Sequence, residues 1–67
     1  MSIAKVTEIS STSPKSFEDA IEKGIARASA TLRNVRSVWI KEQHVRVDEG
    51  RVSEYQVNMM VTFVLEE

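Results

Sequence analysis

The clearest pattern in the chain is an alternation of apolar residues with other residues from Val52 to Leu65. Every second position is apolar in one unbroken row: Tyr55, Val57, Met59, Val61, Phe63 and Leu65. This period of two is typical of a strand with one buried face. The segment contains neither proline nor glycine, as a central strand requires. We therefore predict that it forms the middle of a sheet.

A different spacing, typical of a helix, precedes this strand. Apolar and small residues recur three or four positions apart, at Phe17, Ala20, Ile21, Gly24, Ile25, Ala28, Leu32 and Val35. Ser13 can cap the helix, and Pro14 suits its first position. Gly24 lies on the apolar stripe, where a missing side chain would let the helix approach a sheet closely.

Two further strands are predicted, from Ile3 to Ser10 and from Ser37 to Val47, because both segments are rich in β-branched residues. The segment Asp48–Arg51 has hairpin-turn chemistry, since Gly50 can adopt a positive φ. The order is therefore β-α-β-β, which predicts an α+β fold in a single domain of residues 1–67. Its simplest form is a three-stranded antiparallel sheet under one helix, with the last strand in the middle.

The position of Trp39, the one tryptophan, depends on the length of the hairpin turn. A two-residue turn places Trp39 opposite Met60, on the sheet face that a single helix leaves uncovered. A three-residue turn slips the register by one residue and moves Trp39 into the core. The shorter turn is favoured because it buries Val38 and Ile40.

With an unbroken ladder, the shorter turn also pairs Gln43 with Gln56. It gathers further apolar residues on the uncovered face beside Trp39, namely Val45, Val47, Met60 and Val64. An exposed indole next to amide groups calls for a covering surface, since burying an aromatic side chain is strongly favourable. The candidates are another subunit or a flat aromatic ligand.

Composition narrows the class of protein. The chain has 67 residues, no cysteine, one histidine and a net charge of −1. Disulfides are excluded, and a basic footprint for nucleic acid is absent. No apolar run approaches the roughly 18 residues of a membrane span, and no signal-peptide pattern is present. We expect a cytoplasmic protein without membrane or nucleic-acid partners, which self-associates because so short a chain builds only a small core.

The same residues resemble a known family, the dodecins. The resemblance covers the β-α-β-β order, "TSPKSFEDAIEKGIARA" from Thr12 to Ala28, the strand residue Trp39, and "EYQVNMMVTFVLEE" from Glu54 to Glu67. It implies a hollow homododecamer that binds flavin, either riboflavin or FMN, for storage and buffering. Flavins would stack in pairs between tryptophans of symmetry-related subunits.

Carried over to this sequence, the resemblance implies that Trp39 stacks on the flavin and Gln56 hydrogen-bonds its pyrimidine edge. Arg46 matches a basic position that contacts ligand or a neighbouring subunit. Val64 stands where several members carry a basic residue, so a contact made there is lost in this chain. Glu42 and Gln43 are reminiscent of relatives without the tryptophan.

Two functions stay open at this point. One is a flavin-binding dodecamer; the alternative is a flavin-free structural or cation-binding oligomer in which Trp39 is a subunit contact. No catalytic motif of recognisable spacing is present, so we expect no enzyme and no catalytic residues. His44 with Glu42 is interpreted as a pair of solvated or interface side chains. We assign no residue to a metal site.

Overall fold

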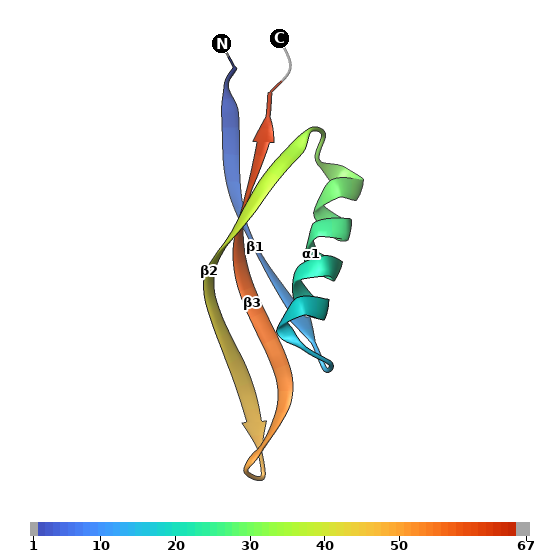
Figure 1. Ribbon diagram of the computed structural model, residues 1–67, viewed down its shortest axis with the longest axis vertical. Coiled ribbons are helices and arrows are strands. Elements are labelled where there is room, and N and C mark those ends of the chain that lie inside the picture. Colours follow the sequence, from blue (N-terminus) through green and yellow to red (C-terminus); the bar gives the residue numbers. More distant parts are fainter. Residues whose placement is uncertain (1, 66–67) are drawn as a thin grey trace.

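The computed structural model describes residues 2–65 of the chain. Four elements follow one another: β1 (Ala4–Ser13), α1 (Phe17–Thr31), β2 (Val35–Asp48) and β3 (Arg51–Val64). The strands form one antiparallel sheet in the order β1-β3-β2, and α1 lies against one face of it (Figure 1). The predicted β-α-β-β fold with the last strand in the middle is confirmed.

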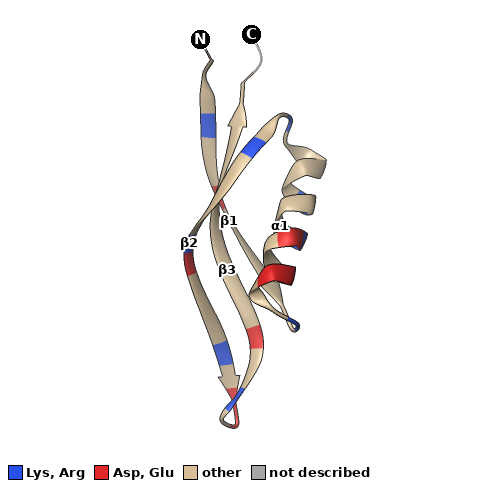
Figure 2. Cartoon of the chain, in the orientation of Figure 1, with Lys and Arg blue, Asp and Glu red and all other residues tan. Residues whose placement is uncertain are grey.

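The subunit is elongated, with extents of 51 × 19 × 13 Å. Its length comes from β2 and β3, whose hairpin end projects beyond the helix and beyond β1 (Figure 1). Basic and acidic positions alternate along this hairpin end without forming a block of one sign (Figure 2).

The core lies between α1 and the alternating row of β3. Val57, Met59 and Val61 are fully buried, as the period of two predicted. Opposite them, the helix buries its small residues Ala20, Gly24 and Ala28. Larger side chains close the margins of this core: Ile9, Phe17, Ile21 and Val38.

The close approach of helix to sheet depends on Gly24. A Cβ atom at this position would collide with the Met59 methyl group and would lie 3.1 Å from the Cβ of Ser11. The Met59 methyl group ends a flexible side chain in the core, whereas the Ser11 Cβ is fixed to the backbone of β1, so a side chain at position 24 would require a shift in the sheet or in Met59. The predicted role of Gly24 as a contact point is confirmed.

The predicted helix start was wrong by one turn. Ser16, not Ser13, is the N-cap, and its Oγ accepts a hydrogen bond from Asp19 N at 2.9 Å. Pro14 lies in the connection between β1 and α1. The reason is that β1 continues to Ser13, whose backbone pairs with Tyr55 of β3. Strand pairing therefore prevails over the local capping signal.

Ser13 has a different task, as a buried polar residue that ties β1 to the helix. Its Oγ donates to Asp19 Oδ2 at 2.6 Å and accepts from Lys15 N at 3.0 Å. Lys23, one turn further on, pairs with the same carboxylate oxygen at 3.2 Å. The hydrogen bond from Ser13 and the proximity of Lys23 hold the pKa of Asp19 below its ordinary value.

The hairpin turn has two residues, as predicted. Asp48 pairs with Arg51, and the connecting Glu49 and Gly50 have φ values of 51° and 75°. Positive φ at both positions is the geometry that a tight hairpin prefers. Trp39 consequently pairs with Met60 and Ile40 with Met59, so the expected register holds at the tryptophan.

Candidate ligand-binding face

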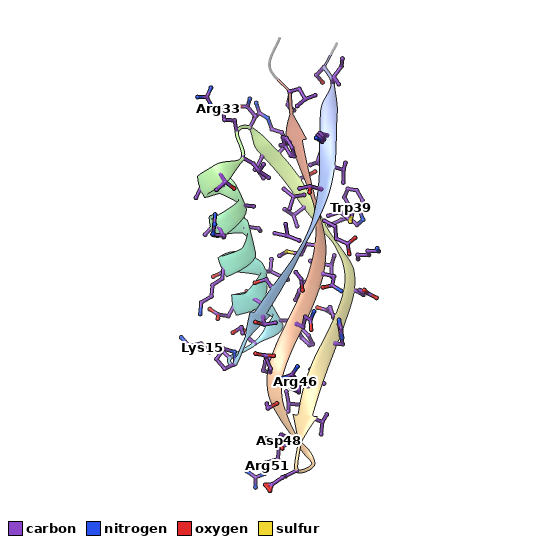
Figure 3. The ribbon with its side chains drawn as sticks, turned by 180° about the vertical axis from the view of Figure 1, so that it is seen from behind. Lys15, Arg33, Trp39, Arg46, Asp48 and Arg51 are labelled. Carbon is purple, nitrogen blue, oxygen red and sulfur yellow. The ribbon has the colours of Figure 1, made fainter. Side chains whose placement is uncertain are left out.

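The face of the sheet that looks away from α1 carries the candidate site. Trp39 projects from β2 on this side (Figure 3) and remains 50% exposed. Its neighbour across the ladder is Met60, and Met60 in turn pairs with Glu8 of β1. An indole and a thioether therefore form an apolar patch at mid-sheet, which no helix or strand of residues 2–65 covers.

The strand β2 is not regular, and its irregularity decides which residues join Trp39. The pairing with β3 shifts between Ile40 and Glu42, leaving Lys41 as an extra residue. Such a bulge reverses the alternation of side chains beyond it. Trp39 and Arg46 are seven positions apart, an odd number that would put them on opposite faces of a regular strand. The bulge brings them to the same face.

The prediction of an unbroken ladder between the strands was therefore wrong beyond Ile40. Gln43 pairs with Val57 instead of Gln56, and Val45 pairs with Tyr55. Both therefore lie on the helix side of the sheet, not beside Trp39. A second shift, between Arg46 and Val47, restores the register at the turn, where Val47 pairs with Val52 in the exposed hairpin end.

All three residues named from the sequence share the uncovered face. Gln56 pairs with His44, and Arg46 pairs with Glu54, so both positions continue the row that contains Met60 and Asn58. Trp39 is not adjacent to Gln56, however. Met60 and Gln56 are four residues apart on β3, about 14 Å at roughly 3.4 Å per residue. A ligand contacting both would have to be long and flat, or would bridge two subunits.

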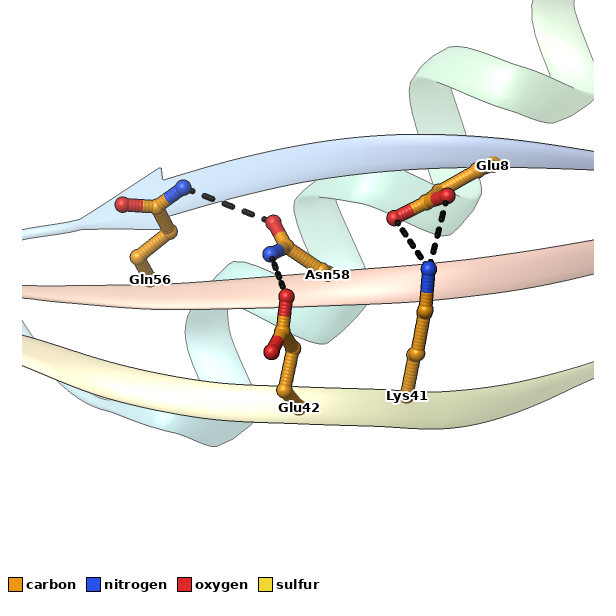
Figure 4. Close-up of polar contacts among 5 residues, drawn as sticks. All are labelled: Glu8, Lys41, Glu42, Gln56 and Asn58. Carbon is orange, nitrogen blue, oxygen red and sulfur yellow. Dashed lines mark hydrogen bonds and ion pairs between the residues drawn. The ribbon is translucent and has the colours of Figure 1, made fainter.

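A row of hydrogen-bonded polar side chains, which includes Gln56, crosses this face of the sheet (Figure 4). Gln56 Nε2 donates to Ser10 Oγ at 2.9 Å and to Asn58 Oδ1 at 3.4 Å. Asn58 Nδ2 donates to Glu42 Oε1 at 2.8 Å. The row joins β1, β3 and β2 and holds the Gln56 amide in a defined direction.

An ion pair separates the apolar patch from this polar row. Lys41, the bulged residue, places its Nζ 3.2 Å from Glu8 Oε1 (Figure 4). Both side chains are about half exposed, so the pair contributes little to stability. Its effect is to draw two flexible side chains together beside the indole.

Glu42, His44 and Asn58 belong to this face but were not predicted as site residues. Glu42 and His44 were interpreted as solvated or interface side chains, and an unbroken ladder would place them on the face opposite Trp39. The odd spacing of Trp39 and Arg46 is the one signal that pointed to a bulge. It becomes informative only when both residues are expected to meet the same ligand.

The face is a platform and not a cavity. A hollow of about 500 Å³ lies elsewhere, along the β1 edge beside α1, where Ile9, Gly24 and Ala28 line it together with Lys23 and Arg27. Within residues 2–65, no three His, Cys, Asp or Glu side chains gather closely enough to hold a metal ion. The helix within that range, α1, lacks the length and apolar character needed to span a membrane.

Fold and face together define a class: a small β-α-β-β subunit with one face closed by its helix and one aromatic and amide-bearing face left open. The family model for dodecins matches residues 3–66, and the chain belongs to the dodecin family. Dodecins are small binding and storage proteins, not enzymes. The family resemblance noted in the sequence is therefore confirmed.

Individual relatives cover nearly the whole chain. A dodecin from Thermus thermophilus is 40% identical over 65 residues, which are 97% of this chain and 94% of the relative. The solved dodecin from Streptomyces davaonensis is 38% identical with a TM-score of 0.93, covering 98% of this chain and 97% of that one.

A third relative is named for a cation. The calcium dodecin of Mycobacterium tuberculosis is 33% identical over 63 residues, which are 94% of this chain and 89% of the relative. Its structure, described as having a novel calcium-binding site, has a lower TM-score of 0.83 at 30% identity and covers 96% of this chain and 91% of that one. The family therefore includes at least one member named for calcium.

Proposed function

We propose that this chain is a flavin-binding storage and buffering protein that assembles into a homododecamer. Trp39 stacks on the isoalloxazine ring, and Gln56 hydrogen-bonds the pyrimidine edge. Flavins are held in pairs between the Trp39 side chains of symmetry-related subunits. Riboflavin and FMN are both candidate ligands, since both carry the same ring system.

The observation that carries this proposal is the exposure of Trp39. A large indole that is half exposed on an uncovered sheet face is costly in water, because aromatic surface gains free energy when it is covered. A flat aromatic ring matches the shape of the indole, and stacking adds a geometric preference to the burial. The neighbouring Met60 is adaptable and pairs well with aromatic surfaces.

Arg46 extends the site toward the hairpin end. Arg46 pairs with Glu54 in the ladder and belongs to the same face, from which a guanidinium can bind an anionic group or a carboxylate of a neighbouring subunit. The first role favours FMN, whose phosphate distinguishes it from riboflavin. The expected readout is an FMN-to-riboflavin affinity ratio that falls in Arg46→Ala if Arg46 contacts the phosphate.

Assembly follows from the small core. Ala20, Ala28, Val57, Met59 and Val61 are the buried apolar residues of the described chain, which is little for an independent domain. Several large apolar side chains stay exposed outside it: Ile3, Val6, Ile40, Val45, Val47, Val52 and Leu65. Contacts between subunits would cover much of this surface.

The alternative is a flavin-free oligomer that is structural or binds a cation, in which Trp39 is a subunit contact. The calcium-named relative supports this alternative. It predicts that flavin emission is unchanged by the protein and that Trp39→Ala weakens the assembly.

The test is a titration of riboflavin at micromolar concentration, followed by flavin fluorescence. The wild-type protein should quench the emission. Trp39→Ala should weaken binding by roughly thirtyfold or more, because loss of a central aromatic anchor costs about 2 kcal/mol or more. Size-exclusion chromatography should give the same large species for both proteins.

Ile40→Ala is the matched control, since Ile40 neighbours Trp39 but lies on the helix side and is 38% exposed. This variant should quench riboflavin like the wild type. Unchanged flavin emission with the wild-type protein would refute the proposal, and dissociation of Trp39→Ala into small species would favour the alternative.

A further inference from the structure

The polar row consists of Glu42, Asn58, Gln56 and Ser10. The direction of its hydrogen bonds, from donor to acceptor, is set at one end. That end is the carboxylate of Glu42, which can only accept hydrogen bonds. The Asn58 atom 2.8 Å from Glu42 Oε1 must therefore be the amide nitrogen. The other Asn58 atom, the carbonyl oxygen Oδ1, is consequently the one that faces Gln56.

The orientation of Asn58 fixes that of the Gln56 amide. Because Asn58 presents an acceptor, the Gln56 atom 3.4 Å away must be the donor Nε2. The second N–H of this nitrogen is donated to Ser10 Oγ at 2.9 Å. Both Gln56 donors are thus occupied within the subunit, and Gln56 Oε1 accepts no hydrogen bond from residues 2–65. The amide offers the ligand an acceptor only.

We propose that Glu42, acting through Asn58, is a positioning residue that holds Gln56 with its amide oxygen outward, so that the site selects ligands whose facing edge carries an N–H donor. This inference rests on the proposed flavin site, and it specifies how that site tells ligands apart. In a flavin the matching group is the imide N–H at N3, which lies between two carbonyl groups.

Glu42 is the residue of the row that selects one of the two possible orientations of the amides. Asn58 and Gln56 each carry both a donor and an acceptor, and a serine hydroxyl can serve as either. Without a fixed charge at one end, the two amides could rotate together and present Gln56 Nε2 outward. The bulge at Lys41 is what brings Glu42 onto this face, opposite Asn58.

The test compares riboflavin with N3-methylriboflavin, in which the N–H is replaced by N–CH₃. The wild type should bind riboflavin about tenfold or more tightly, because the methylated ligand leaves the Gln56 oxygen unpaired. Glu42→Leu and Glu42→Lys should reduce this ratio to about threefold or less. Glu42→Gln should be intermediate, since its amide can still accept from Asn58.

A rescue separates the relay from local disturbance of the fold. In the double variant Glu42→Leu/Asn58→Asp, a carboxylate at position 58 accepts from Gln56 Nε2 whatever residue stands at 42. The double variant should therefore regain most of the wild-type ratio. The matched control is Glu22→Lys, which makes the same change of charge on the exposed side of α1, away from this face, and should leave the ratio unchanged.

The outcomes are distinguishable. If the wild type quenches riboflavin but Glu42→Leu and Glu42→Lys keep the wild-type ratio, the positioning role is overturned and the flavin site stands. A variant that loses discrimination without rescue in the double variant also overturns it. If the wild type quenches neither ligand, the proposed function fails, and the selection inferred from it fails with it.

Discussion

The two faces of the sheet are built from alternate residues of the same strands, yet they differ in almost every physical property. Toward α1, β3 buries Val57, Met59 and Val61 completely. Away from α1, the intervening residues Gln56, Asn58 and Met60 are only partly covered. Gln56 and Asn58 form an ordered polar row with Glu42, and Met60 pairs with Trp39. The covered face is defined by the close packing of its side chains, and the open face by the direction of its hydrogen bonds.

This difference indicates how each face should respond to substitution. Truncation on the covered face removes close-packed contacts, and its cost appears in the free energy of unfolding. Truncation on the open face leaves the subunit nearly as stable and changes what it can bind. Adjacent residues of β3 therefore allow the comparison to be tested directly.

The largest effect is expected from the pair Met59→Ala and Met60→Ala. Met59 is fully buried, so its truncation should lower the free energy of unfolding by about 2–5 kcal/mol. Met60, one position away on the open face, should cost less than about 1 kcal/mol in the flavin-free protein. Urea denaturation of both variants measures the difference. Equal losses would mean that the open face is packed as tightly as the core.

Gly24→Ala should destabilise the protein by about 1–2 kcal/mol, because the added methyl collides with Met59 and crowds Ser11. Helix propensity alone predicts the opposite, a gain of about 1 kcal/mol. The exposed helix residue Ala26 supplies the control, since Ala26→Gly should follow propensity and lose about 1 kcal/mol. Thermal unfolding of the two variants tests whether the close contact between helix and sheet at Gly24 outweighs helix propensity in determining stability.

The attachment of the helix should weaken in acid through Asp19. Its pKa is held below 3.8 in the folded protein by Ser13 and Lys23. A depressed pKa contributes stability that is fully present above the unfolded value and is lost as pH falls from about 4 through the folded pKa. Urea midpoints between pH 7 and pH 2 should therefore fall more steeply for the wild type than for Asp19→Asn.

Glu18→Gln is the control for this titration, because Glu18 lies in the same first helical turn but is exposed. Its acid profile should stay close to that of the wild type. Parallel profiles for the wild type and Asp19→Asn would contradict the role assigned to the Ser13–Asp19 contact.

The smallest effect concerns the turn that sets the register of both faces. Glu49 adopts a φ of 51°, a conformation that asparagine tolerates better than glutamate. Glu49→Asn should raise the free energy of unfolding by up to about 1 kcal/mol and leave riboflavin quenching unchanged. A shift of register would instead alter the environment, and hence the emission spectrum, of Trp39.

Much of the covered face could be predicted from the sequence. The alternating row from Tyr55 to Phe63, the close-contact glycine Gly24 and the two-residue turn at Glu49 and Gly50 all carry local signals. These signals agree with one another, because a single buried face imposes one period on each element. The helix start was misplaced since Ser13 pairs in β1, a non-local interaction that the capping signal does not contain.

The open face could be predicted only in part. Trp39 and Gln56 were assigned to it correctly from the register, and Arg46 was named through family resemblance. The bulge at Lys41 was not predicted, so Gln43 and Val45 were placed on the wrong face. A bulge depends on how two strands twist against each other, and a pattern along one strand does not record this. The hydrogen-bonded row through Glu42 was missed for the same reason.

The central claim, that Trp39 is a stacking platform for flavin, is tested most directly by the emission of Trp39 itself. It is the only tryptophan of the chain, so its fluorescence reports on this site alone. During titration with riboflavin, tryptophan and flavin emission should both be quenched, with a break at one flavin per chain, as pairs between two Trp39 side chains require. Tryptophan emission that stays constant while riboflavin is added in excess would contradict the account.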